Sequence, residues 1–273
     1  MKINIIYVTN QCNLKCPYCY ERNKENKKKV ITKKEIQQYI KYMVENEPNQ
    51  VSSTCIIGGE PTLEFDKMYY IFNEFKKVRQ KYGKQIAYNF ITNGTLLHKY
   101  TDKLYEMTYS SEVFTSFEVS YDGSFQHIRT GKSKIVEKNL ELLNKLNIPF
   151  GISYTITKNT MDIYLQDIIE TLERFFTSKS NLNHKKIRIN IDRSGIEQEL
   201  GYKEGNAKYE AICKDLLKSS LYLYSLYEIP LCDFACASCM RCNKSLFDGR
   251  HYTIPQQKEL FEPLYTKNKF NHF

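Results

Sequence analysis

The sequence lacks the features of a membrane or an exported protein. It contains no run of about eighteen apolar residues, the length that a membrane-spanning helix needs. The N-terminus has no basic region followed by an apolar segment and a small-residue cleavage site, which is the pattern of a secretory signal. We therefore expect neither membrane insertion nor export, and we expect a cytoplasmic protein.

A scattered cysteine framework of the kind that staples small secreted domains is also missing. Most of the nine cysteines fall in two tight groups, whose C-x2-C spacings suit metal ligation in a reducing compartment. Cys55 and Cys213 stand apart from both groups. Cys55 lies in an apolar run, so we expect it to be a small buried side chain.

Internal repeats, long linkers and basic motifs interleaved with aromatic residues are absent as well. The net charge of +9 comes largely from lysines spread along amphipathic segments, which a solvated surface explains. The charge is therefore weak evidence for an acidic peptide, and a nucleic-acid partner is not expected. A chain of 273 residues suffices for one large α/β domain with a short extension.

Apolar runs alternate regularly with amphipathic segments along the chain, which predicts repeated strand–helix units around a parallel sheet. The expected strands span residues 3–8, 54–57, 87–91, 115–120, 150–156 and 187–191. The expected helices span residues 33–45, 67–81, 97–106, 135–146, 163–176 and 207–227. Thr32 and Glu35 predict a capping box for the first helix, and Asp66 is the expected N-cap of the second.

Six such units predict an α/β fold, a partial (β/α)6 TIM barrel over residues 1–228. Past Pro230 the helical periodicity stops. We therefore expect a short cysteine-rich C-terminal extension over residues 229–273.

The first cysteine group stands directly after the first expected strand, where Cys12, Cys16 and Cys19 form a C-x3-C-x2-C triplet. Three thiolates with this spacing can hold three irons of a [4Fe-4S] cube, which leaves the fourth iron without a cysteine. A metal site with an open position is usually one that does chemistry. We interpret the triplet as a substrate-binding cluster, with structural zinc as the alternative for a triplet taken alone.

Three further motifs follow the triplet in order: Gly58-Gly59-Glu60-Pro61-Thr62, Thr92-Asn93-Gly94, and Ser120-Tyr121-Asp122-Gly123 with His127 and Arg129. Together the four signatures resemble the radical S-adenosylmethionine (SAM) enzymes, in which the amine and carboxylate of SAM chelate the open iron. Each motif falls at the carboxyl end of an expected strand, where chemistry gathers in parallel α/β barrels. The resemblance and the expected geometry therefore agree.

The resemblance implies roles for the first two motifs. Tyr18 is expected to pack against the adenine of SAM, or only to shield the cluster from solvent. Gly58 and Gly59 would let the backbone approach the ligand, and Glu60, followed by Pro61, would meet the methionine ammonium. Taken alone, a Gly-Gly-Glu-Pro segment would be an ordinary turn.

The resemblance also implies that polar side chains at the later strand ends contact the ribose or the carboxylate of SAM, namely those of Thr92, Asn93, Ser120 and Asp122. Their alternative role is turn formation and helix capping, and for Asp122 bracing of the loop. Arg129 is a candidate partner for the SAM carboxylate or for Asp122, with a surface ion pair as the remaining alternative. His127 is expected to be structural.

The second cysteine group, Cys232, Cys236, Cys239 and Cys242, resembles the SPASM and twitch extensions of peptide-modifying radical SAM enzymes. It predicts an auxiliary [4Fe-4S] cluster, with a zinc ion or free redox thiols as alternatives. Cys239 and Gly249 keep the family's nine-residue gap, but Ile254 stands where the final cysteine would be. The departure leaves open a different ligation, an open iron or no cluster.

The resemblance implies reductive cleavage of SAM to methionine and a 5'-deoxyadenosyl radical that abstracts a hydrogen from carbon. The expected function is modification of a peptide precursor of ribosomal origin by crosslinking, epimerisation or oxidation. The alternatives are an activating or sulfatase-maturating enzyme and, in another class, a zinc-stapled nucleic-acid-binding protein.

The resemblance further implies an electron donor such as flavodoxin or ferredoxin. Because the first strand begins at residue 3, we expect a leader peptide to be recognised by the barrel, the extension or a separate leader-binding protein. Cys213 is a candidate hydrogen-atom donor to a substrate radical.

Overall fold

The computed structural model describes residues 2–19, 29–46, 52–129, 131–157, 159–160, 162–176 and 186–191, and the statements below concern these residues. The expected helix at 207–227, the boundary at 228 and the extension over 229–273 lie outside them. Within the described ranges, every helix is too short or too polar to cross a membrane.

Six parallel strands form one sheet in the order β1-β2-β3-β4-β5-β6, so each strand pairs with its neighbour in the sequence. The strands are β1 (Lys2–Thr9), β2 (Ser52–Gly58), β3 (Ile86–Thr92), β4 (Phe114–Ser120), β5 (Gly151–Ile156) and β6 (Lys186–Ile191). The helices are α1 (Lys33–Asn46), α2 (Phe65–Tyr82), α3 (Thr101–Thr108), α4 (Ser133–Lys145) and α5 (Tyr164–Phe175). Short 3-10 segments are η1 (Pro61–Glu64), η2 (Leu97–Lys99) and η3 (Gly123–Arg129).

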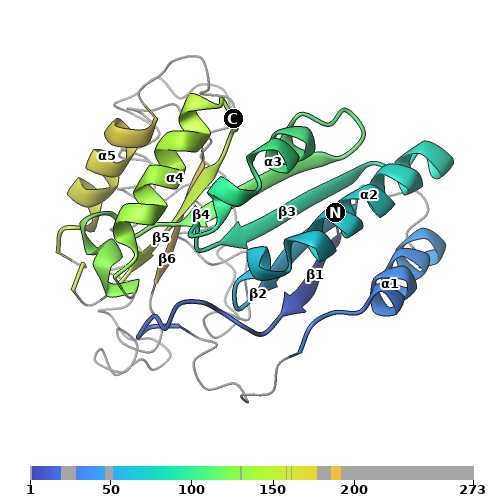
Figure 1. The fold of residues 1–273 in the computed structure, drawn as a ribbon, viewed down its shortest axis with the longest axis horizontal. Coiled ribbons are helices and arrows are strands. Elements are labelled where there is room, and N and C mark those ends of the chain that lie inside the picture. Colours follow the sequence, from blue (N-terminus) through green and yellow to red (C-terminus); the bar gives the residue numbers. More distant parts are fainter. Residues whose placement is uncertain are drawn as a thin grey trace, which may run out of the picture.

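Figure 1 shows α1 and α2 at the β1 side of the sheet and α4 and α5 toward the β6 side. The sequential parallel order, with β1 and β6 at the two ends, is the arrangement of a partial (β/α) barrel. The predicted α/β fold is therefore confirmed. Because all strands run the same way, their carboxyl ends share one edge of the sheet.

The first two helices differ in how they begin. At α1 the Thr32 backbone N–H donates to Glu35 Oε2 at 2.7 Å and the Glu35 N–H donates to Thr32 Oγ1 at 3.2 Å, which confirms the capping box. The expected Asp66 cap of α2 is wrong, because the helix begins at Phe65 and Asp66 lies in its first turn. Since η1 leads directly into α2, Glu64 occupies the N-cap position.

The segment expected as one helix over 97–106 is divided into η2 and α3. Tyr100 separates them with a non-helical φ of −132°, and its ring stacks on Phe65 of α2 at 4.0 Å between centroids. A helical pattern in the sequence does not reveal such an interruption, because the stacking partner comes from another element.

Aromatic residues form the core between the sheet and its helices. Tyr88 of β3 is fully buried and meets Phe72 and Phe75 of α2 edge-on. Phe90 stacks on Phe117 of the next strand at 4.8 Å between centroids. Burial of each such side chain contributes roughly 1.5–3 kcal/mol. This core holds the strands in register, and residues that alternate with the core positions point to the opposite face of the sheet.

Candidate active site

The cysteine triplet lies in the loop that leaves β1 at the carboxyl edge of the sheet. The Leu14 N–H donates to Cys12 Sγ at 3.3 Å, and the Cys19 N–H donates to the Cys16 carbonyl oxygen at 3.1 Å. Cys12 is exposed, and Cys16 and Cys19 are half-buried. The loop therefore has a defined turn conformation with its thiols within reach of an incoming cluster.

The Gly-Gly-Glu segment after β2 holds this loop through its backbone. The Gly59 N–H donates to the Thr9 carbonyl oxygen at 2.9 Å, and the Glu60 N–H donates to the Gln11 carbonyl oxygen at 2.7 Å. A Cβ on Gly58 would lie 2.3 Å from the Thr9 oxygen, and one on Gly59 would lie 2.3 Å from the Gln11 oxygen. The structure thus shows one reason for both glycines: Gly58 packs closely on Thr9 at the end of β1, and Gly59 packs closely on Gln11 of the cysteine loop.

Glu60 is buried and bound to the chain itself. Its Oε1 accepts the Thr62 N–H at 2.9 Å, the Thr62 hydroxyl and the Thr92 hydroxyl at 2.7 Å, and its Oε2 accepts the Asn93 N–H at 2.6 Å. Burial raises the pKa of Glu60, and these hydrogen bonds lower it. Glu60 therefore joins the start of η1, which opens with the buried Pro61, to the end of β3.

Asn93 links the end of β3 to the cysteine loop. Its Nδ2 donates to Asn13 Oδ1 at 2.8 Å and lies 3.7 Å from Cys12 Sγ, and its Oδ1 accepts the Thr95 N–H at 3.0 Å. Asn13 in turn donates to the Thr95 hydroxyl at 2.8 Å. We had not selected Asn13 and Thr95 from the sequence, although Asn13 stands directly after the first cysteine.

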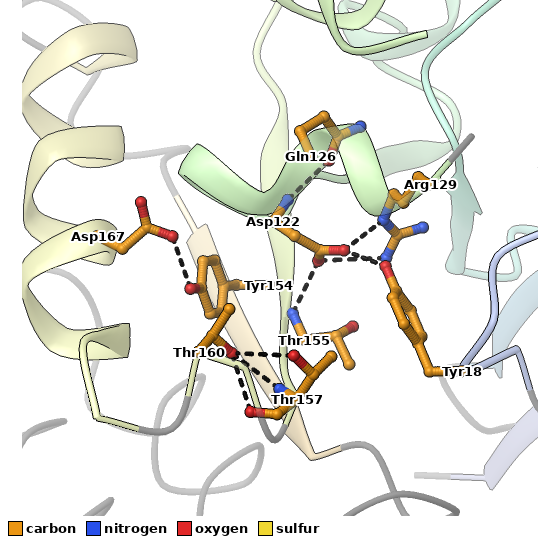
Figure 2. Close-up of polar contacts among 9 residues, drawn as sticks. All are labelled: Tyr18, Asp122, Gln126, Arg129, Tyr154, Thr155, Thr157, Thr160 and Asp167. Atoms are coloured by element: carbon orange, nitrogen blue, oxygen red, sulfur yellow. Dashed lines mark hydrogen bonds and ion pairs between the residues drawn. The ribbon is translucent and has the colours of Figure 1, made fainter. Parts of the chain in front are cut away.

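Asp122 joins three segments of the chain at the other end of the site, namely the cysteine loop, η3 and β5, as Figure 2 shows. Its Oδ2 accepts Arg129 Nε at 2.6 Å and the Tyr18 hydroxyl, and its Oδ1 accepts the Thr155 N–H at 3.0 Å and Arg129 Nη2 at 3.3 Å. The Arg129 guanidinium carbon lies 5.2 Å from the centre of the Tyr18 ring. Of the partners considered for Arg129, the structure therefore shows Asp122.

A third buried carboxylate, Asp167 of α5, positions the loop that carries Asp122. It accepts the Ser124 N–H at 2.8 Å. It also accepts the Tyr154 hydroxyl at 2.7 Å, as Figure 2 shows. Gly123 has a φ of +56°, and a Cβ there would lie 2.2 Å from the Asp167 carboxylate. Sequence reasoning missed Asp167 and Tyr154, because no local motif surrounds them.

The two remaining residues of the fourth motif, Ser120 and His127, lie at different places in the structure. Ser120 is half-buried at the end of β4, where it pairs in register with Ser153. His127 is exposed, and its Nδ1 lies 3.2 Å from the Ser124 carbonyl oxygen, so its described contact is local. Cys213, Cys232, Cys236, Cys239 and Cys242 lie outside the described residues.

The three thiols near β1 influence one another electrostatically. Burial raises the pKa of Cys16 to about 11, the charge of Arg129 lowers it, and Cys12, Cys19 and Asp122 raise it. The described residues contain no group of His, Cys, Asp or Glu side chains gathered around a single-ion site. A zinc ion needs all its sulfurs at about 2.3 Å, whereas the cysteines of a cube bind separate irons. The spacing of the triplet in the sequence is therefore the observation that indicates a cluster.

Cys55 lies on the sheet face opposite the core and is half-buried. Burial raises its pKa to about 11, Arg188 lowers it and Glu118 raises it. These two residues form a forked ion pair, with Arg188 Nε 2.8 Å and Nη2 2.9 Å from the Glu118 carboxylate oxygens. We expected a small buried side chain at Cys55; the structure places it partly buried on the face opposite the core, within electrostatic range of Glu118 and Arg188.

Comparison with known proteins identifies the family. Residues 6–173 match the Radical SAM superfamily. The chain belongs to this superfamily. It is therefore an enzyme whose family uses SAM and a [4Fe-4S] cluster, as the resemblance of the four motifs predicted.

The radical SAM chain has relatives of several kinds. It is 32% identical over 239 residues to an uncharacterised protein of Methanocaldococcus jannaschii, an alignment that covers 84% of this chain and 76% of the relative. It is 26% identical over 254 residues to a probable GTP 3',8-cyclase of Methanococcus aeolicus, with 89% and 82% covered. It is 26% identical over 167 residues to a cysteine-type anaerobic sulfatase-maturating enzyme of Clostridium novyi, with 56% and 42% covered.

Among solved structures, anSMEcpe with bound SAM and the Cp18Cys peptide shares the fold. The TM-score is 0.53 at 23% identity, and the match covers 82% of this chain. The chain spans 59% of that structure's length. The likeness supports the barrel architecture.

Substitution of Gly59 by alanine tests the contact that holds the cysteine loop. The new Cβ would overlap the Gln11 backbone, so Gly59→Ala should lower iron incorporation on anaerobic reconstitution and destabilise the fold by about 1–3 kcal/mol. Gly131→Ala is the control for iron content: its φ of +71° makes any side chain strained, but a Cβ there would meet nothing within 4 Å, so it should lower stability without lowering iron incorporation. Equal iron content in the two variants would contradict this account.

The raised pKa of Cys55 predicts slow alkylation in the folded protein. With a pKa of about 11, Cys55 should react with iodoacetamide at pH 8 about a hundredfold more slowly than in the unfolded chain. The rate should rise as the pH approaches 11, because the thiolate is the reactive form. Mass spectrometry of the Cys55 peptide measures this rate, and equal rates in folded and unfolded protein would refute the prediction.

Proposed function

We propose that this radical SAM enzyme modifies a side chain or α-carbon of a ribosomally made peptide precursor, by crosslinking, epimerisation or oxidation. The observation that carries the proposal is the position of the cysteine loop at the carboxyl edge of the sheet. The Gly58-Gly59-Glu60 segment and Asn93 hold one part of this loop by hydrogen bonds, and Asp122 holds another part. The shared fold with anSMEcpe, solved with SAM and a peptide, supports a peptide substrate at this edge.

Cys12, Cys16 and Cys19 would ligate three irons of the SAM-binding cluster. The cluster, when bound, would supply the electron that cleaves SAM to methionine and a 5'-deoxyadenosyl radical. Asn93 would orient the first ligand, since its amide contacts Cys12 and Asn13. Five further residues of the same edge would position SAM, namely Tyr18, Gly58, Gly59, Thr92 and Ser120. Glu60 and Asp122 would hold these residues in place by bracing their loops.

Polar side chains on the sheet face opposite the core would contact the substrate. Arg188 pairs with Glu118, and Asn89 donates to Ser53 at 3.1 Å and accepts from the Ser116 hydroxyl. A peptide offers backbone donors and acceptors along its length. These groups can therefore form hydrogen bonds with an extended peptide on this face of the sheet, below the carboxyl edge where SAM would bind.

Two other substrate classes remain as candidates. The sulfatase-maturating relative supports a folded protein substrate. The probable GTP 3',8-cyclase matches 89% of this chain, which supports a nucleotide substrate. Membership in an enzyme family argues against a zinc-stapled nucleic-acid-binding protein.

Further parts of the proposal concern residues beyond the described ranges. Cys232, Cys236, Cys239 and Cys242 would hold an auxiliary [4Fe-4S] cluster, and Cys213 would donate a hydrogen atom to the substrate radical. About eight irons per chain would support two clusters and about four would support one. We further propose reduced flavodoxin or ferredoxin as the electron donor, a separate leader-binding protein and a cytoplasmic location.

Replacement of Cys12, Cys16 and Cys19 by alanine should abolish 5'-deoxyadenosine formation from SAM under dithionite, because the cluster loses its thiolates. Cys55→Ser is the matched control, since Cys55 lies in β2 outside the cysteine loop. Chromatography of the nucleoside product measures the effect. A triple variant that still cleaves SAM would overturn the cluster assignment.

The substrate class is tested with the reconstituted enzyme, SAM and dithionite. A peptide encoded beside this protein should show a mass change and consume SAM in proportion, whereas GTP should remain unchanged. Mass spectrometry of both mixtures gives the answer. Conversion of GTP without any modification of the peptide would contradict the proposal and favour a GTP cyclase activity.

A further inference from the structure

A buried ion pair lies directly beside the cysteine loop. The side chains of Arg129 and Asp122 are only 10% and 3% exposed, and Arg129 Nε donates to Asp122 Oδ2 at 2.6 Å. Burial of such a pair seldom adds net stability, because both charges lose their hydration. Its presence therefore calls for a role of the charges themselves.

The surrounding hydrogen bonds fix how the pair is oriented. Asp122 also accepts the Tyr18 hydroxyl and the Thr155 N–H, and its own N–H donates to Gln126 Oε1 at 2.8 Å (Figure 2). The guanidinium lies over the ring of Tyr18, the residue directly before Cys19. Arg129 thus presents a fixed positive charge to the part of the loop that contains Cys16 and Cys19.

The two charges would act in opposite directions on a cluster held by this loop. A positive charge favours an added electron, and a negative charge opposes it. In a protein interior, fixed charges act with little screening because the local dielectric constant is low.

We propose that Arg129, held in place by Asp122 and Tyr18, is a positioning residue that stabilises negative charge at the cluster and thereby raises its reduction potential. The reduction takes one electron from a low-potential donor such as dithionite or reduced flavodoxin, and no bond or proton changes at Arg129 or Asp122. The inference rests on the proposed cluster at Cys12, Cys16 and Cys19.

Redox titration of the reconstituted full chain without SAM, followed by electron paramagnetic resonance, tests the proposal. Arg129→Gln removes the positive charge and should lower the potential, whereas Asp122→Asn leaves Arg129 uncompensated and should raise it. Each shift should reach about tenfold in the reduction equilibrium, or 59 mV for one electron. The double variant should lie between the two single variants.

Two further variants separate charge from structure. Arg129→Lys keeps the positive charge and should hold the reduction potential near the native value. This variant tests the proposal even where Arg129→Gln fails to retain iron. Arg174→Gln is the matched control, because Arg174 pairs with Glu137 at 3.0 Å on the exposed side of α5 and should not move the potential.

Opposite shifts of the two single variants support the proposal, because a merely structural pair would move both in one direction or neither. Unmoved potentials, shifts of the same sign, or an effect of Arg129→Gln on SAM binding alone would overturn it. Absence of any cluster signal in the native protein would instead refute the proposed function, so the two failures are distinguishable.

Discussion

Two backbone hydrogen bonds, from Gly59 to Thr9 and from Glu60 to Gln11, hold the cysteine loop against the end of β2. The other contacts of the site depend on this position of the cysteine loop. Asn93 reaches Cys12 and Asn13 only because the loop returns toward β3, and Tyr18 reaches Asp122 only because the same loop continues across to β4. The contact requires two residues without a Cβ, since a Cβ at Gly58 would overlap the carbonyl oxygen of Thr9 at the end of β1, and one at Gly59 would overlap that of Gln11 in the loop.

Three buried carboxylates then join the loops at the carboxyl edge. Glu60 connects η1 with β3, Asp122 connects the cysteine loop with η3 and β5, and Asp167 connects η3 with α5 and β5. An unpaired buried carboxylate would cost several kcal/mol, so each one accepts several donors from different segments. This arrangement makes the edge rigid before any cofactor binds, which favours a single geometry for the reacting groups.

Much of the fold followed from local pattern. The strand positions, the order of the helices as far as α5 and the capping box at Thr32 and Glu35 depend on residues close in the sequence, and the structure confirms them. The Asp66 cap and the unbroken helix over 97–106 were wrong, because the chain enters α2 from η1 and because Tyr100 stacks on Phe65. Cys55, expected as a small buried side chain, is partly buried: its neighbour Ile56 faces the core, whereas Cys55 lies on the opposite face of β2, within electrostatic range of Glu118 and Arg188.

The sequence by itself determined the family chemistry, since the spacing of Cys12, Cys16 and Cys19 and the order of the later motifs are properties of the chain alone. Only the tertiary structure decided what the polar residues of these motifs contact. Arg129 had a cofactor, an aspartate or the surface as possible partners, and the fold pairs it with Asp122 because β4 and η3 bring both under Tyr18. Asp167 and Tyr154 carried no local signal, because their partnership joins a helix to a strand and arises only when the two pack together.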